Sequence, residues 1–275
     1  MGELFSNSRL SSFENCPKKF HFRYILKIPA PTESIEAFVG KRVHEVFERL
    51  YIALDKGHVP TLAQVLHRFN ALWDEHYAPE RVRIVRTENP VDFYRENGEH
   101  CLSNYYRRHY PFDADETLSL EDRVLFALDE DGQYRLQGII DRVSRARDGA
   151  IEIHDYKTGQ WVPSQKKLDS DRQLALYQIG IGERHGAGAP VRLVWHYVSR
   201  GQTRTSTRTT EQLSELRAET MELIDQIRAE VRFEPRPGPL CRWCEYADRC
   251  PANPEARADA SQMVPPSPDD QLRLL

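Results

Sequence analysis

Apolar residues recur at helical spacing through the first part of the chain. The segment 34–56 shows this most clearly, with a stripe formed by Val39, Val43, Val46, Phe47 and Leu50. Such a stripe is typical of the buried face of one helix. Two further helices are predicted over 61–76 and 91–109. Near the start, Ser8 is the expected N-cap of a helix over Arg9 to Asn15, and Pro17 suits the first turn of a continuing helix.

The pattern after this helical part predicts a sheet. Strands are expected at about 120–128, 134–144 and 150–156, joined by turns at Asp131-Gly132 and Asp148-Gly149. A helix over about 169–184 and ending near Gly186, strands at 191–199 and 203–209, and a helix over 211–231 are expected next. Three strands followed by a helix and a further strand indicate a mixed α/β fold.

Composition narrows the class of protein. The chain has 275 residues, 40% of them hydrophobic and 29% charged, which suits one well-packed domain with room for a helical insertion. The chain contains no run of about 18 apolar residues, so no membrane span is predicted. The N-terminus lacks the apolar core of a signal peptide, so a cytoplasmic protein is expected. The net charge of −4 argues against a generic nucleic-acid coat protein, although local basic patches still matter.

Two predicted strands carry the candidate chemistry. Because alternate residues of a strand share a face, Asp155 and Lys157 are expected to project together while Tyr156 points the other way. A second carboxylate, Asp141, lies on the neighbouring strand. Two carboxylates and a lysine suit a site that binds Mg²⁺ and activates water. For D-x-K alone, an ion pair at a strand edge is the more common explanation.

The motifs around these strands resemble a known family. Gly138-Ile139-Ile140-Asp141 followed by Asp155-Tyr156-Lys157 resembles the core of the PD-(D/E)XK nuclease superfamily, in its RecB-like branch. Gly40 to His44 resembles the G-x-x-x-H helix of that branch, and Gln173 to Tyr177 resembles its Q-x-x-x-Y helix. A cysteine frame resembles the iron–sulfur subgroup, which includes the AddB-type nuclease domain and the CRISPR-adaptation exonucleases. It consists of Cys16, Cys241, Cys244 and Cys250.

The resemblance covers roughly residues 8–251 and implies a domain organisation. It implies a restriction-endonuclease-like core (αβββαβ) with an N-terminal helical subdomain and a C-terminal iron–sulfur cluster region. The nuclease domain is expected to span 1–251, with 57–112 as a helical insertion. The remaining tail, 252–275, is rich in Pro, Asp and Ala and is predicted to be disordered.

The resemblance also assigns roles to single residues. The ligands that it implies for Mg²⁺ or Mn²⁺ are His44, Asp141, Asp155 and the carbonyl oxygen of Tyr156. Lys157 would position the attacking water and offset charge on the phosphate. Gln173 and Tyr177 share a helix face and could hold Lys157 or the scissile phosphate. Without the motifs, His44 is more simply an interior histidine, and Gln173 and Tyr177 are a polar helix surface with one amphipathic tyrosine.

The cysteines have a separate implication. Five cysteines in a cytosolic chain favour metal ligation over disulfides. The spacing Cys-x2-Cys-x5-Cys with a remote fourth cysteine does not match a common zinc ribbon. The resemblance implies a structural [4Fe–4S] cluster on Cys16, Cys241, Cys244 and Cys250. A zinc-stabilised binding module is the alternative. Cys101 is expected to be a small buried apolar residue.

Two basic segments are candidate DNA contacts. Lys18, Lys19 and Arg23 are interleaved with aromatic residues near the N-terminus, which suits a groove where bases stack, or equally a solvated helix face whose aromatics belong to the core. An expected hairpin carries three more basic residues, Arg200, Arg204 and Arg208. Gly138, inside a predicted strand, indicates either a close approach by the His44 helix or DNA, or a simple bulge.

Together these features predict a metal-dependent DNA nuclease. The expected activity is that of an exonuclease on single-stranded or frayed ends, in DNA repair, recombination or CRISPR-type defence. DNA is the expected partner, with a helicase or integrase as a candidate protein partner and no membrane. The alternative is a catalytically silent accessory subunit that grips DNA for a helicase or integrase.

Overall fold

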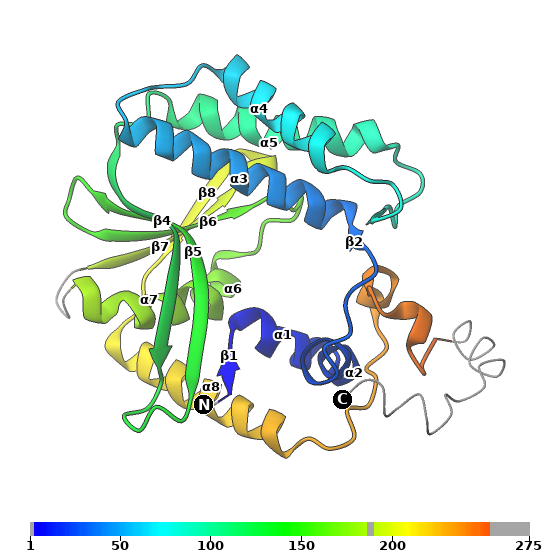
Figure 1. The fold of residues 1–275 in the computed structure, drawn as a ribbon. Coiled ribbons are helices and arrows are strands. Elements are labelled where there is room, and N and C mark those ends of the chain that lie inside the picture. Colours follow the sequence, from blue (N-terminus) through cyan, green and yellow to red (C-terminus); the bar gives the residue numbers. More distant parts are fainter. Residues whose placement is uncertain (1–2, 186–189, 254–275) are drawn as a thin grey trace.

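A computed structural model describes residues 3–185 and 190–253. Figure 1 shows helices on both faces of a twisted sheet, as expected for a mixed α/β fold. The helix end expected near Gly186 lies outside the described residues, as does nearly all of the tail predicted for 252–275.

Three helices cover one face of the sheet (Figure 1). They are α3 (Ile35–Asp55), α4 (Leu62–His76) and α5 (Val91–His109), which confirms the three helices expected from the spacing. Ser34 caps α3 by accepting a hydrogen bond from the Ala37 amide, and Thr61 forms a capping box with Gln64 in α4. Their apolar stripes form one buried cluster that also includes Tyr156 from the sheet. This cluster fixes the position of α3 over the strands.

Among the described residues, the main sheet has six strands. They are β1 (Leu4–Phe5), β4 (Asp115–Ala127), β5 (Arg135–Ala146), β6 (Ile151–Lys157), β7 (Val191–Tyr197) and β8 (Gln202–Ser206). β4 and β6 each pair antiparallel with β5, and β7 pairs parallel with β6. β8 pairs antiparallel with β7. β4 begins five residues before the expected start, and a 3₁₀ turn at Val198–Arg200 ends β7 early. The two-residue β1 is too short for a pattern to predict.

The sheet opens along one edge of β5. On this edge β5 pairs first with β1, at Arg135 and Leu136, and then with β6 from Arg142 to Arg145. The stretch 137–141 between these ladders has no strand partner there, so the two partners of β5 diverge. We call this opening the fork. Asp141 lies at its β6 side, next to the last paired residue.

The other face of the sheet is covered by helices from three parts of the chain. They are α1 (Asn7–Asn15), α7 (Arg172–His185) and α8 (Thr210–Ala229). The prediction of Ser8 as N-cap is wrong, because Ser6 accepts the hydrogen bond from Arg9 and Ser8 lies inside α1. The helix expected from 169 is also interrupted. A short α6 (Gln165–Asp169) precedes α7, and Asp171 accepts a hydrogen bond from the Gln173 amide at the break.

The N-terminal segment and the cysteine-rich segment lie side by side. Pro17 begins α2 (Pro17–Phe20), as expected, and a π-helix follows over His21–Ile25. Two 3₁₀ turns, η3 (Pro239–Trp243) and η4 (Ala247–Arg249), carry the late cysteines. The Tyr246 hydroxyl donates to the Ile28 carbonyl, 218 positions earlier in the chain. A small parallel pair, β2 (Glu33–Ser34) with β3 (Val82–Arg83), lies at the start of α3.

Candidate active site

The fork places Asp141 and Asp155 on adjacent strands. After the pair formed by Arg142 and His154 the regular ladder between β5 and β6 stops. The Tyr156 amide, next in line on β6, donates instead to Asp141 Oδ2 at 2.9 Å. The side chain of Asp141 thus takes the place of a strand partner. This bond orients Asp141 toward the residues at the end of β6.

Asp155, Lys157 and Gln173 form a closed set of contacts. Lys157 Nζ donates to Asp155 Oδ1 and to Gln173 Oε1, each at 3.0 Å, and Gln173 Nε2 donates to Asp155 Oδ1 at 3.1 Å. Burial raises the pKa of Asp155, with Asp141 adding to the rise and Lys157 opposing it. Burial lowers the pKa of Lys157, but Asp155 outweighs it, so the net shift is upward. Lys157 is therefore an ammonium donor held by its neighbours.

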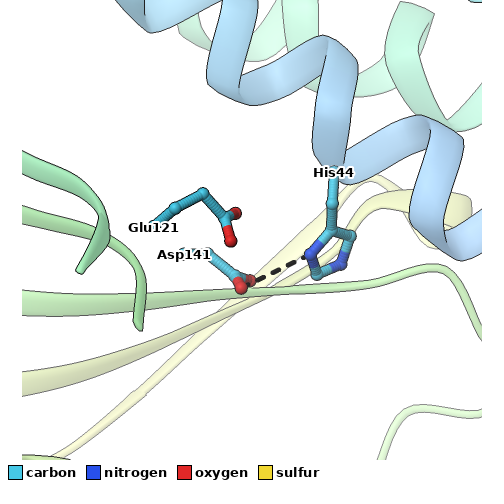
Figure 2. Close-up of side chains that lie close together, drawn as sticks. All are labelled: His44, Glu121 and Asp141. Carbon is cyan, nitrogen blue, oxygen red and sulfur yellow. Dashed lines mark ion pairs between the residues drawn. The ribbon is translucent and has the colours of Figure 1, made fainter. Parts of the chain in front are cut away.

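His44 reaches the same place from α3 (Figure 2). Its Nε2 lies 2.8 Å from the Tyr156 carbonyl oxygen, and its Nδ1 lies 3.4 Å from Asp141 Oδ1. Burial by itself lowers the pKa of His44, but Asp141 and Asp155 raise it to about 9. His44 is thus an interior histidine whose two nitrogens both face groups that the sequence motifs single out.

A third carboxylate, Glu121, was not expected at this site. Leu120 pairs with Arg142 and Asp122 with Ile140, so Glu121 on β4 faces Asp141 across the strands. Its φ of 45° is unusual for a residue with a side chain. Ligand atoms of His44, Glu121 and Asp141 all lie within 4.8 Å of one another, and Figure 2 shows them converging. A glutamate in a strand pattern is typical of a solvent-facing position, so no sequence signal identifies it.

The donor set fits a hard divalent cation. Asp155 Oδ2 lies 2.8 Å from Lys157 Nζ but receives no well-directed hydrogen bond, which leaves a buried lone pair for a cation. His44 Nε2 and the Tyr156 carbonyl oxygen are 2.8 Å apart. This contact is a hydrogen bond, and a cation would take these two atoms in exchange for it; imidazole nitrogen suits Mn²⁺, and carboxylate and carbonyl oxygens suit Mg²⁺. These residues can therefore hold Mg²⁺ or Mn²⁺.

Tyr177 lies behind the site, in the core. A Cβ atom at Gly138 would lie 2.2 Å from its ring, so the close approach at Gly138 is made by Tyr177 and not by α3. The side chain of Tyr177 points from α7 toward the strands and is buried against them, so this position is not part of a polar helix surface. Burial raises the pKa of Tyr177, and Gln173 opposes this rise. Tyr177 thus lies next to the residue that holds Lys157.

Comparison with known proteins agrees with this geometry. The profile of the PD-(D/E)XK nuclease superfamily matches residues 4–251. The chain belongs to this superfamily.

Two relatives of this superfamily member differ in what they show. It is 28% identical over 168 residues to a subunit of an ATP-dependent helicase/deoxyribonuclease from Streptococcus uberis. That match covers 57% of this chain but 14% of the relative, so the chain spans about a seventh of its length. A solved structure from Eubacterium rectale, designated a candidate exonuclease, has a TM-score of 0.52 and 16% identity, and the match covers 95% of this chain and 94% of the other. It shows the shared fold.

This nuclease-superfamily protein has a second cluster of histidines and carboxylates, on the same strands but nearer to α5. We call it the buried network. Its members are Asp115, Arg142, Ser144, Glu152, His154 and His196. Arg142 binds both carboxylate oxygens of Asp115 at 2.7 and 3.0 Å, and His154 Nδ1 lies 2.9 Å from His196 Nε2. Burial, followed by Arg142, lowers the pKa of His154.

This network does not suit a cation, although ligand atoms of Asp115, Glu152 and His154 also lie within 4.8 Å of one another. The guanidinium of Arg142 already occupies Asp115, and Arg192 binds Glu152 at 2.5 Å. A cation would enter beside these two positive charges and would have to displace both. The buried network is therefore a paired structural cluster.

The four frame cysteines form no disulfide, and two of them accept backbone hydrogen bonds. Cys16 accepts from the Arg236 amide at 3.4 Å, and Cys241 accepts from the Gly238 amide at 3.3 Å. Burial raises the pKa of Cys244, and Cys16 adds to that rise. Amide donors around sulfur fit thiolate ligands of a soft metal. Neither candidate metal group found among the described residues includes a cysteine. Burial raises the pKa of Cys101 to about 12, as befits an apolar core residue.

The predicted basic residues are largely engaged in contacts within the protein. Lys19 and Arg23 form ion pairs with Glu245 at 2.7 and 3.5 Å, which ties α2 and the π-helix to the cysteine segment. Lys18 shares α2 with Lys19. Phe20 is fully buried, so this aromatic belongs to the core. Arg208 donates to the carbonyls of Leu168 and Asp171, where it holds the break between α6 and α7.

In the described parts of the chain, no helix combines the length and apolarity needed to span a membrane.

Proposed function

We propose that this protein is a divalent-metal-dependent deoxyribonuclease that hydrolyses phosphodiester bonds. One observation carries the proposal. The fork brings Asp141 beside the end of β6, where Asp155, Lys157 and the Tyr156 carbonyl converge with His44. A paired acidic site with a fixed ammonium group next to it suits a phosphate substrate.

Each residue has a distinct task in this proposal. The metal ligands are His44, Asp141, Asp155 and the carbonyl of Tyr156, and we add Glu121 as a further carboxylate. A bound Mg²⁺ or Mn²⁺ supplies a Lewis acid and a water of lowered pKa. Lys157 has three N–H bonds, of which two go to Asp155 and Gln173, so one can donate to the phosphate or the attacking water. Gln173 orients Lys157, and Tyr177 lies next to Gln173.

Substitution of the three central residues tests the activity. Asp141→Asn, Asp155→Asn and Lys157→Met should each lower the cleavage rate by at least about a hundredfold, because the first two remove the charge of a proposed metal ligand and the third removes the ammonium group beside the phosphate. Glu116→Gln, which removes an exposed carboxylate from the same strand as Glu121, serves as the matched control. An end-labelled oligonucleotide assay with Mg²⁺ and Mn²⁺ measures the rates. Full activity in any two of the three variants would show that the assignment of the active site is wrong.

The role of His44 is tested by the choice of metal. Mg²⁺ demands a complete, near-ideal octahedral set of ligands, whereas Mn²⁺ accepts a wider range of ligand types. His44→Ala should lower the rate more in Mg²⁺ than in Mn²⁺, because Mn²⁺ tolerates a poorer ligand set. Equal rates for wild type and variant in both metals would return His44 to a packing role.

We further propose that the enzyme acts as an exonuclease on single-stranded or frayed DNA ends, with a helicase partner. The resemblance to the AddB-type branch supports this, because the curated relative is named as a subunit of an ATP-dependent helicase/deoxyribonuclease. Labelled single and double strands, with free and blocked ends, distinguish these substrates. Equal cleavage of a circular single strand would contradict the exonuclease assignment. DNA binding without any cleavage would favour the accessory-subunit alternative.

We also propose a structural [4Fe–4S] cluster on Cys16, Cys241, Cys244 and Cys250. The hydrogen bond from the Arg236 amide to Cys16 and the ion pairs of Glu245 support it, because they bring the two ends of the nuclease domain together. Anaerobically purified protein should contain about four irons per chain. Cys16→Ser should lose the chromophore and lower the thermal stability. One zinc and no iron under these conditions would overturn the cluster and leave the nuclease proposal intact.

A further inference from the structure

Trp161 is an exposed tryptophan next to the candidate active site. It lies in the connection between β6 and α6, four positions after Lys157. Its exposed fraction is 63%, whereas Trp73 and Trp195 are buried and Trp243 is half-buried. Four residues of extended chain span at most roughly 14 Å, so the indole stays within reach of a few nucleotides from the site.

The backbone on either side of Trp161 is fixed. The Ser199 hydroxyl donates to the Gly159 carbonyl at 2.7 Å, and Arg200 Nε donates to the Gln160 carbonyl at 2.8 Å. The Gln160 side chain donates to Asn97 on α5 at 2.7 Å. Val162, on the other side, packs against the core under α7. The neighbours of Trp161 on both sides are therefore held in place, while its own indole remains exposed. Binding to a rigid aromatic surface costs little conformational entropy.

A positive charge accompanies the ring. Lys167 Nζ, from α6, lies over one face of the Trp161 ring, 4.8 Å from its centroid, so a base would stack on the opposite face. Lys166 and Lys167 are both exposed, and Arg200 lies under the same connection. A single nucleotide offers a flat base and a negative phosphate, and an indole beside an ammonium group complements both. The base of a duplex is covered by its stacked neighbours, so only an unpaired base can use the ring in this way.

We propose that Trp161 and Lys167 form a stacking subsite for an unpaired base of single-stranded DNA that enters the active site. This inference rests on the proposed nuclease function and deepens it, because it gives a physical reason for a single-strand preference. The ring holds the base, and Lys167 contacts the adjacent phosphate. Neither residue contacts the metal ligands, so the subsite acts on DNA binding and not on the chemistry.

Binding in Ca²⁺ tests the subsite without relying on cleavage. Trp161→Ala should weaken the binding of a short single-stranded oligonucleotide by about tenfold, equivalent to about 1.4 kcal/mol, and leave the affinity for a blunt duplex unchanged. Trp161→Phe should retain most of the affinity. Tyr110→Ala is the control, because Tyr110 is 59% exposed and lies about 20 Å along the α5 axis from Asn97.

Two further readouts are specific to the two side chains. Single-stranded DNA should quench the tryptophan fluorescence of wild type, and this quenching should be lost in Trp161→Phe. Lys167→Gln should reduce the slope of log affinity against log salt by about 0.7, as expected for one lost phosphate contact.

The outcomes separate this inference from the proposed function. Unchanged single-strand affinity in Trp161→Ala, equal losses for single strand and duplex, or no measurable binding by wild type would each overturn the subsite. Full cleavage by the Asp141 and Asp155 variants would overturn the nuclease site, while a selective affinity loss in Trp161→Ala would still support the subsite.

Discussion

The strands β4, β5 and β6 carry two clusters of the same residue types with opposite behaviour. At the fork, Asp141, Asp155 and Glu121 supply three carboxylates. Their cationic partners are Lys157 and the imidazole of His44. In the buried network, Asp115 and Glu152 face His154, but Arg142 and Arg192 neutralise both carboxylates. The pKa of His44 is raised to about 9, whereas the pKa of His154 is lowered.

The difference shows that partners, and not residue types, decide what a cluster can bind. Both groups bring ligand atoms within 4.8 Å of one another. At the fork, the negative charges exceed the positive ones, and a buried carboxylate oxygen lacks a directed donor. In the buried network, each of the two carboxylates has an arginine. A bound cation would therefore stabilise the cluster at the fork. In the buried network it would be repelled by the two arginines.

The largest expected effect comes from breaking the pairing in the buried network. Arg142→Met should lower the free energy of unfolding by about 3–5 kcal/mol, because it leaves the carboxylate of Asp115 buried without its cation. Urea unfolding measures this loss. The double variant Arg142→Met with Asp115→Asn should recover part of it, because the uncompensated charge is also removed. A double variant as unstable as the single one would show that shape, not charge, explains the loss.

The next effect is a dependence of stability on pH. Burial, followed by Arg142 and Arg108, lowers the pKa of His109 from 6.5 to about 4. Between these values the unfolded chain binds a proton that the folded chain does not. Stability should therefore fall as the pH drops from about 6.5 to 4, with His109 contributing at most about 3 kcal/mol.

His109→Phe isolates this contribution. The phenyl ring can keep the stacking on Tyr105, and the Nε2 atom that it removes has no hydrogen-bond partner. The variant should lose less stability than wild type between pH 6.5 and 4 in thermal unfolding. Parallel pH profiles for the two proteins would exclude His109 as a source of the dependence.

A smaller effect is expected at the fork itself. Gly138→Ala should cost about 1–3 kcal/mol, because its Cβ would lie 2.2 Å from the Tyr177 ring and the ring cannot bend. Combining it with Tyr177→Leu should cost less than the sum of the two single changes. Chemical denaturation of the four proteins checks this coupling. Fully additive costs would mean that the ring moves away freely.

The smallest effect compares two glutamates in matched positions. Glu121→Gln should weaken Mn²⁺ binding by about tenfold, or about 1.4 kcal/mol, because it removes one carboxylate from the fork. Glu152→Gln removes one carboxylate from the buried network and should leave Mn²⁺ affinity unchanged. Calorimetric titration measures both. Equal weakening by the two variants would show that the two clusters do not differ in their affinity for Mn²⁺.

The sequence predicted the long helices and the core strands well. Apolar stripes located α3, α4 and α5 closely, because burial of one helix face imposes a regular spacing. Errors occurred where local hydrogen bonds decide the boundary. Ser6 and not Ser8 caps α1, and the break before α7 depends on Asp171 and on Arg208 from a distant segment. Two-residue strands such as β1 carry no periodicity to detect.

For the site, the sequence by itself determined which motif residues to consider. The strand alternation brings Asp155 and Lys157 to one side, and the motif order points to Asp141, His44 and Gln173. Only the tertiary structure decided that Glu121 joins them and that Lys19 and Arg23 bind Glu245. It also decided that Gly138 accommodates Tyr177. The physical reason is that spacing specifies the face of an element on which a residue lies, whereas charge pairing and ring contacts depend on elements that are distant in the chain.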